Sequence, residues 1–258
     1  MATCFSKIGE SYDLIYENKD YKTEAIFVSD LIHENLNIPE GSRPHLLDIA
    51  SGSSRHAIEL SRLGYNVETS EPSNEMRGLA DKNYKKAGFS LEGYSYSFQE
   101  LAKIEKNYEI VTILFGSIGY LTSEEELIRC FKEVHRLLNK GGIFLLDFWN
   151  LPAVKTQFSP LKVMNKESDN MQLYRISETT LDSANDVATV NYTLIELYKD
   201  GTWNKSTESH LVRYFSPHKM KETLSSSGLE VLKICPFGEL DAVVSDSDWN
   251  VTMVCKKT

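Results

Sequence analysis

Short apolar runs alternate with longer amphipathic stretches over the first half of the chain. Runs of strand length stand at 45–49, 65–70 and 108–115. The stretch 55–63 places its apolar residues at helical spacing before Gly64 ends it, and a second helix is expected from the N-cap Ser73 to about residue 87. Strands that alternate with helices are typical of parallel sheets, so the pattern predicts an α/β fold.

The same pattern extends to both ends of the chain. A helix is expected over 20–36, before the first strand. Another helix is expected from Thr122 or Ser123 to about residue 139, where Gly141-Gly142 would end it. The remaining predicted elements are a weak strand at 90–96, a strand at 143–149, a helix from Ser216 to Gly228, and strands at 229–235 and 250–256.

Between residues 150 and 215 the pattern changes from helical units to alternating strands. Asp200-Gly201 separates two alternating runs and is a strong hairpin signal, and a second turn stands at 183–186. These turns predict a three-stranded antiparallel insertion after the fifth strand. The expected domains are 1–149 joined with 216–258, and 150–215 as an insertion that forms a substrate lid.

Composition narrows the class of protein. The chain has 258 residues, of which 41% are hydrophobic and 25% charged, and this suits one α/β domain with an addition. A formal net charge of −9 disfavours a duplex nucleic-acid partner. No signal peptide and no apolar run of bilayer length is recognised, so a soluble, cytoplasmic protein is expected. Its cysteines are scattered without a C-x-x-C pair, which predicts reduced thiols and no zinc site: Cys4, Cys130, Cys235 and Cys255.

The strongest functional signal is the stretch that joins the first two strands. The turn reads Asp48-x-Ala50-x-Gly52-x-Ser54, and the second strand delivers Glu71 about 20 residues beyond the turn. Small residues let the backbone approach a ligand, and the unpaired N–H groups of the following helix attract anions. A carboxylate at the tip of the second strand can accept both hydroxyls of a ribose. This unit predicts a site for a nucleoside with an anionic or zwitterionic tail, and the acid before the turn disfavours a dinucleotide.

This stretch resembles motif I of the class I S-adenosylmethionine-dependent methyltransferases, which usually reads acid-x-Gly-x-Gly-x-Gly. Glu71 matches the ribose-binding acid of that family. Ala50 and Ser54 stand where glycines are usual, and because both are small we expect tighter geometry without loss of binding. The resemblance implies a Rossmann-like, seven-stranded, mostly parallel sheet with helices on both faces and an antiparallel last strand. It implies S-adenosylmethionine as the cofactor, at the carboxyl edge of the sheet.

Carried over residue by residue, the resemblance implies a set of cofactor contacts. Ser97 stands where the family pattern often has an acid for the adenine amino group. The implied contacts are Asp48, Ala50 and Gly52 around the methionine part, Tyr21, Arg55 and His56 at its tail, Glu71 and Pro72 at the ribose, Met76, Ser97 and Phe98 at the adenine, and Phe115, Gly116 and Tyr120 under the sulfonium.

Segments along the chain also resemble the bacterial nucleotide-sugar N,N-dimethyltransferases. YDLIY, FGSIGYL, KGG and HLVRYFSP occur in the same order, and a wider group that includes glycine-type N-methyltransferases shares them. In the sugar-modifying branch the second tyrosine of the first segment approaches the acceptor amine, and Tyr16 matches it. Tyr16 is therefore the implied catalytic residue. The implied substrate contacts are Tyr12, Trp149, His210 and Arg213, the last of which could face a phosphate.

Several functions remain open from the sequence. The best match is methyl transfer to the amino group of a nucleotide-linked amino sugar, and the alternatives are O-methylation of a small metabolite or a non-catalytic S-adenosylmethionine sensor. No convincing Asp/His/Asp metal set is present, which favours an amine or an acidic hydroxyl as acceptor. The negative charge and the lack of an N/D-P-P-Y tetrad disfavour a nucleic-acid methyltransferase. A small-molecule partner is expected, with no nucleic acid or membrane, and a homodimer is a possible assembly.

Overall fold

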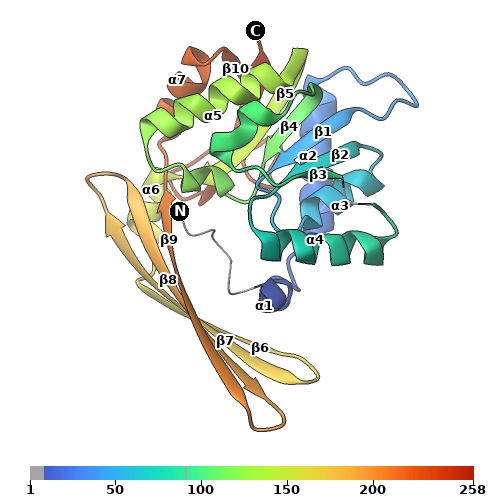
Figure 1. Cartoon of the computed structure of the whole chain (residues 1–258). Coiled ribbons are helices and arrows are strands. Elements are labelled where there is room, and N and C mark those ends of the chain that lie inside the picture. The colour runs from blue at the N-terminus through green and yellow to red at the C-terminus, as the bar shows by residue number, and fades with distance from the viewer. Residues whose placement is uncertain (1–8, 91) are drawn as a thin grey trace.

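A seven-stranded sheet forms the centre of the computed structural model, which describes residues 9–90 and 92–258 (Figure 1). The strand order is β10-β11-β5-β4-β1-β2-β3, and β11 runs antiparallel to both of its neighbours while the other pairings are parallel. The predicted Rossmann-like sheet is therefore confirmed. Its strands are β1 His45–Ile49, β2 Asn66–Ser70, β3 Gly93–Tyr94, β4 Tyr108–Ile113, β5 Leu138–Trp149, β10 Leu229–Pro236 and β11 Asn250–Lys257.

Helices cover both faces of this sheet, and each face has its own hydrophobic core. One core contains Leu31 and Leu60, and the other contains Phe131 and Leu224. The first core packs α2 Tyr21–Asn35, α3 Arg55–Arg62 and α4 Asn74–Ala87. The second packs α5 Glu124–Leu137, α7 Pro217–Ser226 and the short 3-10 helices η1 Phe98–Lys103 and η2 Ser117–Tyr120.

Side-chain caps explain where three of these helices begin. The Asp20 carboxylate accepts a hydrogen bond from Thr23 N at 3.0 Å, and Ser73 Oγ accepts one from Met76 N at 3.3 Å. Of the two caps offered at 122–126, the structure uses Ser123, whose Oγ accepts from Glu126 N at 3.2 Å. Each bond satisfies one of the N–H groups that lack a partner at a helix start.

The end of α5 differs from the sequence-based expectation. The helix stops at Leu137, and Leu138 already pairs with Tyr108 of β4. Pairing along the sheet outweighs the helical tendency of 138–140, so the two glycines lie inside β5. Gly141 takes a left-handed φ of 76° there, next to an irregularity in the β4–β5 register. The weak strand expected at 90–96 is also shorter, because β3 contains two residues; Leu91 lies outside the described residues.

The insertion is a separate antiparallel sheet with the order β6-β7-β8-β9 (Figure 1). It has four strands, so the expectation of three omitted β6. A helix, α6 Leu151–Gln157, precedes it. One face packs against α1 Gly9–Ile15 and the start of α4 through a cluster that includes Tyr12, Met76 and Leu173. The strands are β6 Leu161–Glu167, β7 Met171–Asp182, β8 Val187–Tyr198 and β9 Trp203–Arg213.

Within the described part of the chain, no helix is long and apolar enough to cross a lipid bilayer. Cys130, Cys235 and Cys255 are buried free thiols, and Cys4 lies outside the described residues.

Candidate functional site

The turn after β1 has a backbone that normally requires glycine. Ala50, Gly52 and Ser54 have left-handed φ angles of 56°, 55° and 60°. This region is strained for residues with a Cβ, so alanine and serine hold the chain in a conformation that glycine adopts freely. A Cβ built on Gly52 would meet no atom within 4 Å, which leaves open space beside the turn. Backbone strain that persists in a native fold is typical of ligand sites.

Glu71 joins the end of β2 to this turn. Its carboxylate accepts hydrogen bonds from Gly52 N at 2.9 Å and from Ser73 N at 2.8 Å. The side chain is 8% exposed, and burial raises the pKa of Glu71 above its usual value. The carboxylate is therefore held at the carboxyl edge of the sheet, beside the open turn, where a diol could approach it.

Two further carboxylates are buried at the same edge. Asp48 accepts a hydrogen bond from Thr112 Oγ1 at 2.8 Å, and Asp147 Oδ2 accepts one from Gly116 N at 2.9 Å. Burial raises the pKa of each aspartate to about 7, and the charge of Glu71 adds to the rise at Asp48. Asp147 Oδ1 is buried without a hydrogen-bond partner. Desolvated carboxylates of this kind favour a positively charged ligand.

An aromatic and charged cluster lies beside these acids. The rings of Tyr16 and Phe115 meet edge-on with centroids 5.3 Å apart, and Lys19 Nζ lies 4.4 Å from the centroid of Phe115. Phe115 has a left-handed φ of 62° and is 41% exposed, which is unusual for a large apolar residue. This strained, exposed ring at the carboxyl end of β4 is what a ligand platform requires.

Three residues that the sequence assigns to the cofactor's tail lie together at the starts of α2 and α3. The Tyr21 and His56 rings are 4.8 Å apart, and the Arg55 guanidinium lies 4.9 Å from the Tyr21 ring. His56 Nε2 pairs with Glu24 Oε2 at 2.6 Å, and burial lowers the pKa of His56. Glu24 also pairs with Lys19. Sequence analysis did not single out Glu24, Lys19 or Asp147; a lone acid in the apolar run of β5 is the one signal that could have found Asp147.

A chain of hydrogen bonds links the loop after β4 to the insertion. Tyr120 Oη and His210 Nδ1 are 2.9 Å apart, and His210 Nε2 lies 3.1 Å from Glu208 Oε2. A carboxylate only accepts, so His210 Nε2 donates to Glu208, and in the tautomer with its proton on Nε2 the Nδ1 atom accepts from the tyrosine hydroxyl. His210 is buried. The arrangement can draw a proton away from a group bound next to Tyr120.

Other predicted site residues have structural contacts of their own. The Ser97 backbone N–H and hydroxyl both donate to Glu100, as the cap of η1. Met76 and Tyr12 are buried in the cluster below the insertion, and Pro72 and Phe98 are half-buried. The rings of Trp149 and Trp249 lie 5.6 Å apart. Arg213 Nη2 donates to Glu124 Oε2 at 2.8 Å.

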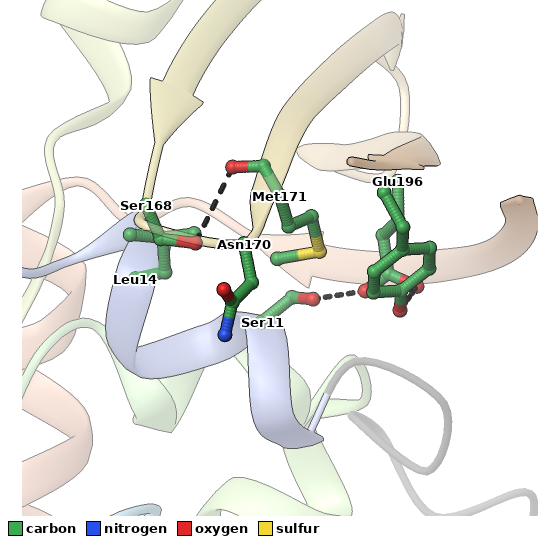
Figure 2. Close-up of a pocket in the computed structure, with 7 residues that line it drawn as sticks. Ser11, Leu14, Ser168, Asn170, Met171 and Glu196 are labelled. Atoms are coloured by element: carbon green, nitrogen blue, oxygen red, sulfur yellow. Dashed lines mark hydrogen bonds between the residues drawn. The ribbon is translucent and has the colours of Figure 1, made fainter. Parts of the chain in front are cut away.

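None of the sequence-predicted site residues lines the pocket of about 320 Å³ shown in Figure 2. It opens between α1 and the ends of β7 and β8. Its lining is Ser11, Leu14, Ser168, Asn170, Met171, Glu196 and Tyr198. Figure 2 shows Ser11 donating to Glu196, a contact that ties α1 to the insertion.

Comparisons with known proteins agree with this geometry. A methyltransferase domain family matches residues 46–142, which span the turn after β1 and Glu71. The chain is 26% identical over 226 residues, 86% of its length and 90% of the relative's, to a dTDP-3-amino-3,4,6-trideoxy-alpha-D-glucopyranose N,N-dimethyltransferase of Streptomyces venezuelae. It is 27% identical over 136 residues, 52% of its length and 50% of the relative's, to a glycine/sarcosine N-methyltransferase of Halorhodospira halochloris.

A solved structure shows the same fold. An S-adenosylmethionine-dependent methyltransferase from Clostridium acetobutylicum superposes with a TM-score of 0.81 at 20% identity, covering 98% of each chain. The chain is a class I S-adenosylmethionine-dependent methyltransferase. This methyltransferase is an enzyme, and its cofactor is S-adenosylmethionine. The alternative of a non-catalytic S-adenosylmethionine sensor is therefore wrong.

The residues present fit that cofactor. S-adenosylmethionine carries a sulfonium and an ammonium group, and the methyltransferase buries the carboxyl groups of Asp48 and Asp147, with Asp147 Oδ1 lacking a hydrogen-bond partner. The left-handed turn leaves open space beside Gly52, and Glu71 stands next to it. No cluster of three or more metal-ligating side chains occurs among the residues that the structure describes.

Proposed function

We propose that this methyltransferase transfers a methyl group to the amino group of a small polar acceptor, with a nucleotide-linked amino sugar as the best fit. The observation that carries the proposal is the position of Tyr16. Its ring packs edge-on against the exposed Phe115 at the cofactor edge, and its hydroxyl accepts a hydrogen bond from Arg175 Nη1 at 3.2 Å. The likeness to an amino-sugar N,N-dimethyltransferase over 86% of the chain supports the same acceptor class.

In this proposal the chain holds the cofactor with groups at the carboxyl edge. The left-handed turn at Ala50–Ser54 binds the methionine part of the cofactor. Glu71 accepts hydrogen bonds from the ribose hydroxyls, and the Asp48 carboxylate balances the positive charge of the cofactor. S-adenosylmethionine, when bound, supplies a methyl group that is already activated by the sulfonium. The protein therefore has to align the acceptor and exclude water.

Tyr16 is the residue that would orient the acceptor. Because Arg175 donates to its oxygen, the second lone pair of that oxygen remains to accept an N–H of an amine. The amine lone pair then stays free for the methyl group. The insertion, which packs over α1, would act as a lid that keeps water out.

A second candidate is O-methylation of a small metabolite. The chain from Tyr120 through His210 to Glu208 favours it, since a hydroxyl acceptor needs a base and an amine does not. The buried free thiols agree with a reducing compartment, and we propose a cytoplasmic location on that basis.

One assay separates the two candidates. The purified enzyme is incubated with S-adenosylmethionine and with matched acceptors: a dTDP-linked 3-amino sugar, the corresponding 3-hydroxy sugar, glycine, and a catechol. We expect methylated product, identified by mass, from an amine. Product from hydroxyl acceptors alone would replace the proposal with O-methylation, and Tyr16→Phe should lower turnover of the preferred acceptor more than it weakens cofactor binding.

A further inference from the structure

We propose that Arg175, on β7 of the insertion, binds an anionic group of the methyl acceptor, a carboxylate or a phosphate. The inference rests on the proposed function, because it takes Tyr16 as the acceptor end of the site. It adds a recognition residue and a chemical requirement: an acceptor that carries a negative charge close to the group that is methylated.

The guanidinium of Arg175 lies against two tyrosine rings. Its central carbon is 5.6 Å from the Tyr16 centroid and 5.5 Å from the Tyr192 centroid. Burial raises the pKa of Tyr192 to about 12, so this ring is a neutral phenol and does not balance the charge. Stacking of this kind fixes the plane of the guanidinium and presents its edge in one direction.

The hydrogen-bonding capacity of Arg175 is mostly unused. Of its five N–H donors, one binds Tyr16 Oη, and Nε is buried without a partner. None of the described carboxylates forms an ion pair with it. The planar fork of arginine binds carboxylate and phosphate in a bidentate way, so an incoming anion would satisfy donors that are now unpaired.

The acids on the same face of the insertion are already engaged. Glu196 accepts from Ser11 and from Asn204 Nδ2, and Glu208 accepts from His210. Directly across from Arg175 the neighbouring strands place Leu194 and Met164. The charge of Arg175 is therefore surrounded by apolar and aromatic side chains, where a salt bridge with a ligand gains more than in water.

Arg213 is the residue that the sequence offers for a phosphate, and the structure gives it a different partner. It pairs with Glu124 at 2.8 Å and lies against the Phe215 ring. Arg175 has no such acid and contacts Tyr16, which in turn packs on Phe115 at the cofactor edge. Between the two arginines, Arg175 is the one placed to receive an anion from the acceptor.

Two kinds of acceptor carry the required anion: a nucleotide-linked sugar through its phosphates, and an amino acid through its carboxylate. The test measures equilibrium binding by calorimetry to the enzyme loaded with S-adenosylhomocysteine. The phosphate arm compares thymidine diphosphate with thymidine, and the carboxylate arm compares glycine with methylamine. The variants are Arg175→Gln, Arg175→Lys and the control Arg129→Gln, which removes an exposed arginine on α5.

We expect the native enzyme to prefer the anion in one arm and Arg175→Gln to lose roughly 10-fold or more of that affinity, with Arg175→Lys in between. Binding of the neutral probe and of S-adenosylhomocysteine should not change. An equal preference for anion and neutral probe in both arms, or an Arg175→Gln variant that binds the anion as well as the native enzyme, would overturn the inference.

A KM and kcat comparison distinguishes anion binding from support of Tyr16. If Arg175 only held Tyr16 in place, Arg175→Gln would lower kcat equally for charged and neutral acceptors, and this result would also count against the inference. Anion binding predicts a higher KM for the charged acceptor alone. Because the calorimetry does not depend on which atom is methylated, O-methylation would refute the proposed acceptor class and leave the Arg175 result standing.

Discussion

The Glu71 carboxylate accepts a hydrogen bond from the backbone N–H of Gly52 at 2.9 Å. The acid that ends β2 is thereby fixed to the turn that follows β1, and a second bond from Ser73 N fixes it to the start of α4. One side chain thus ties together two connections of the sheet, the turn between β1 and α3 and the connection from β2 to α4. A ribose that binds Glu71 would meet a carboxylate that is already oriented, which reduces the ordering needed on binding.

Replacing Ala50 with glycine should relieve strain in the turn. A left-handed φ costs an L-residue roughly 1–2 kcal/mol, and the extra freedom of glycine in the unfolded chain costs about 0.5–1 kcal/mol. Ala50→Gly is therefore expected to leave the free energy of unfolding unchanged or to raise it by up to about 1 kcal/mol. Urea denaturation measures the free energy of unfolding of this variant and of the control Ala102→Gly in η1, which should be destabilised. Equal losses in both variants would mean that Ala50 is unstrained.

Cofactor affinity should depend on pH through Asp48. Burial raises the pKa of its carboxyl to about 7, so the group is protonated below pH 7 and ionised above it. A cationic ligand favours the ionised form, and affinity for S-adenosylmethionine is expected to rise between pH 6 and 7.5, by up to about tenfold per unit below the pKa. The free folded protein also holds a proton that the unfolded chain releases above about pH 4, so the stability of the free protein should fall between about pH 4 and 7 and level off above pH 7.

Asparagine variants check the source of this dependence. Asp48→Asn should bind the cofactor weakly with a shallower pH profile, and Asp147, whose pKa is also raised to about 7, supplies the remaining slope. The double variant with Asp147→Asn should show no slope between pH 6 and 7.5 in calorimetry. A native profile that is flat, or that falls with rising pH, contradicts the assignment.

The Tyr120–His210 pair should matter for turnover if it accepts the proton of the acceptor. With a hydroxyl acceptor, His210→Gln is expected to lower kcat roughly 100-fold with little change in cofactor affinity, as loss of a general base does. An amine acceptor, which needs no base, should be methylated at a nearly native rate. Tyr120→Phe should have a similar effect, and the double variant should be no worse, because the two act as one unit. The control is His218→Gln on the exposed face of α7. Turnover of a hydroxyl acceptor at the native level in His210→Gln would leave this pair a purely structural role.

Arg213 is expected to stabilise the folded protein and not to bind the acceptor. It shares Glu124 with Thr223, whose Oγ1 donates to that carboxylate at 2.9 Å, so the pair joins β9, α5 and α7. Arg213→Gln should lower the free energy of unfolding by about 1 kcal/mol, or roughly 2–4 °C in Tm, with an unchanged KM for the acceptor. Thermal denaturation and steady-state kinetics measure both. A rise in KM without a change in Tm would instead support the phosphate contact that the sequence suggests.

The order of elements in the main sheet could be predicted because each has a strong local signal. Apolar runs, capping residues and terminal glycines identify β1, α3, β2 and α4 without knowledge of the fold. β6 could not be found in this way: its sequence, LKVMNKE, is largely polar and mostly exposed, as suits an edge strand. The extra residues of β5 also escaped detection, since only pairing with β4 makes 138–140 extended.

The part of the site that is built from residues close together in the sequence was predictable. The part that depends on contacts between residues far apart in the sequence was less so. The Asp48–Gly52 turn and Glu71 are close in sequence, and their relation follows from one βαβ unit. The partners of Arg175 and Arg213 lie 159 and 89 residues away from them along the chain. No local pattern distinguishes an arginine that pairs with a glutamate from one without an acidic partner, so the choice between the two required the structure.

The central claim is that Glu71 and the turn beside it hold S-adenosylmethionine. Calorimetric titration of Glu71→Gln with S-adenosylhomocysteine tests it most directly, with the exposed Glu92→Gln as the matched control and Tm measured for both. Loss of hydrogen bonds to a charged group predicts a decrease in affinity of roughly 10-fold or more in Glu71→Gln and no change in Glu92→Gln. A folded Glu71→Gln protein that binds as tightly as the native enzyme would contradict the claim.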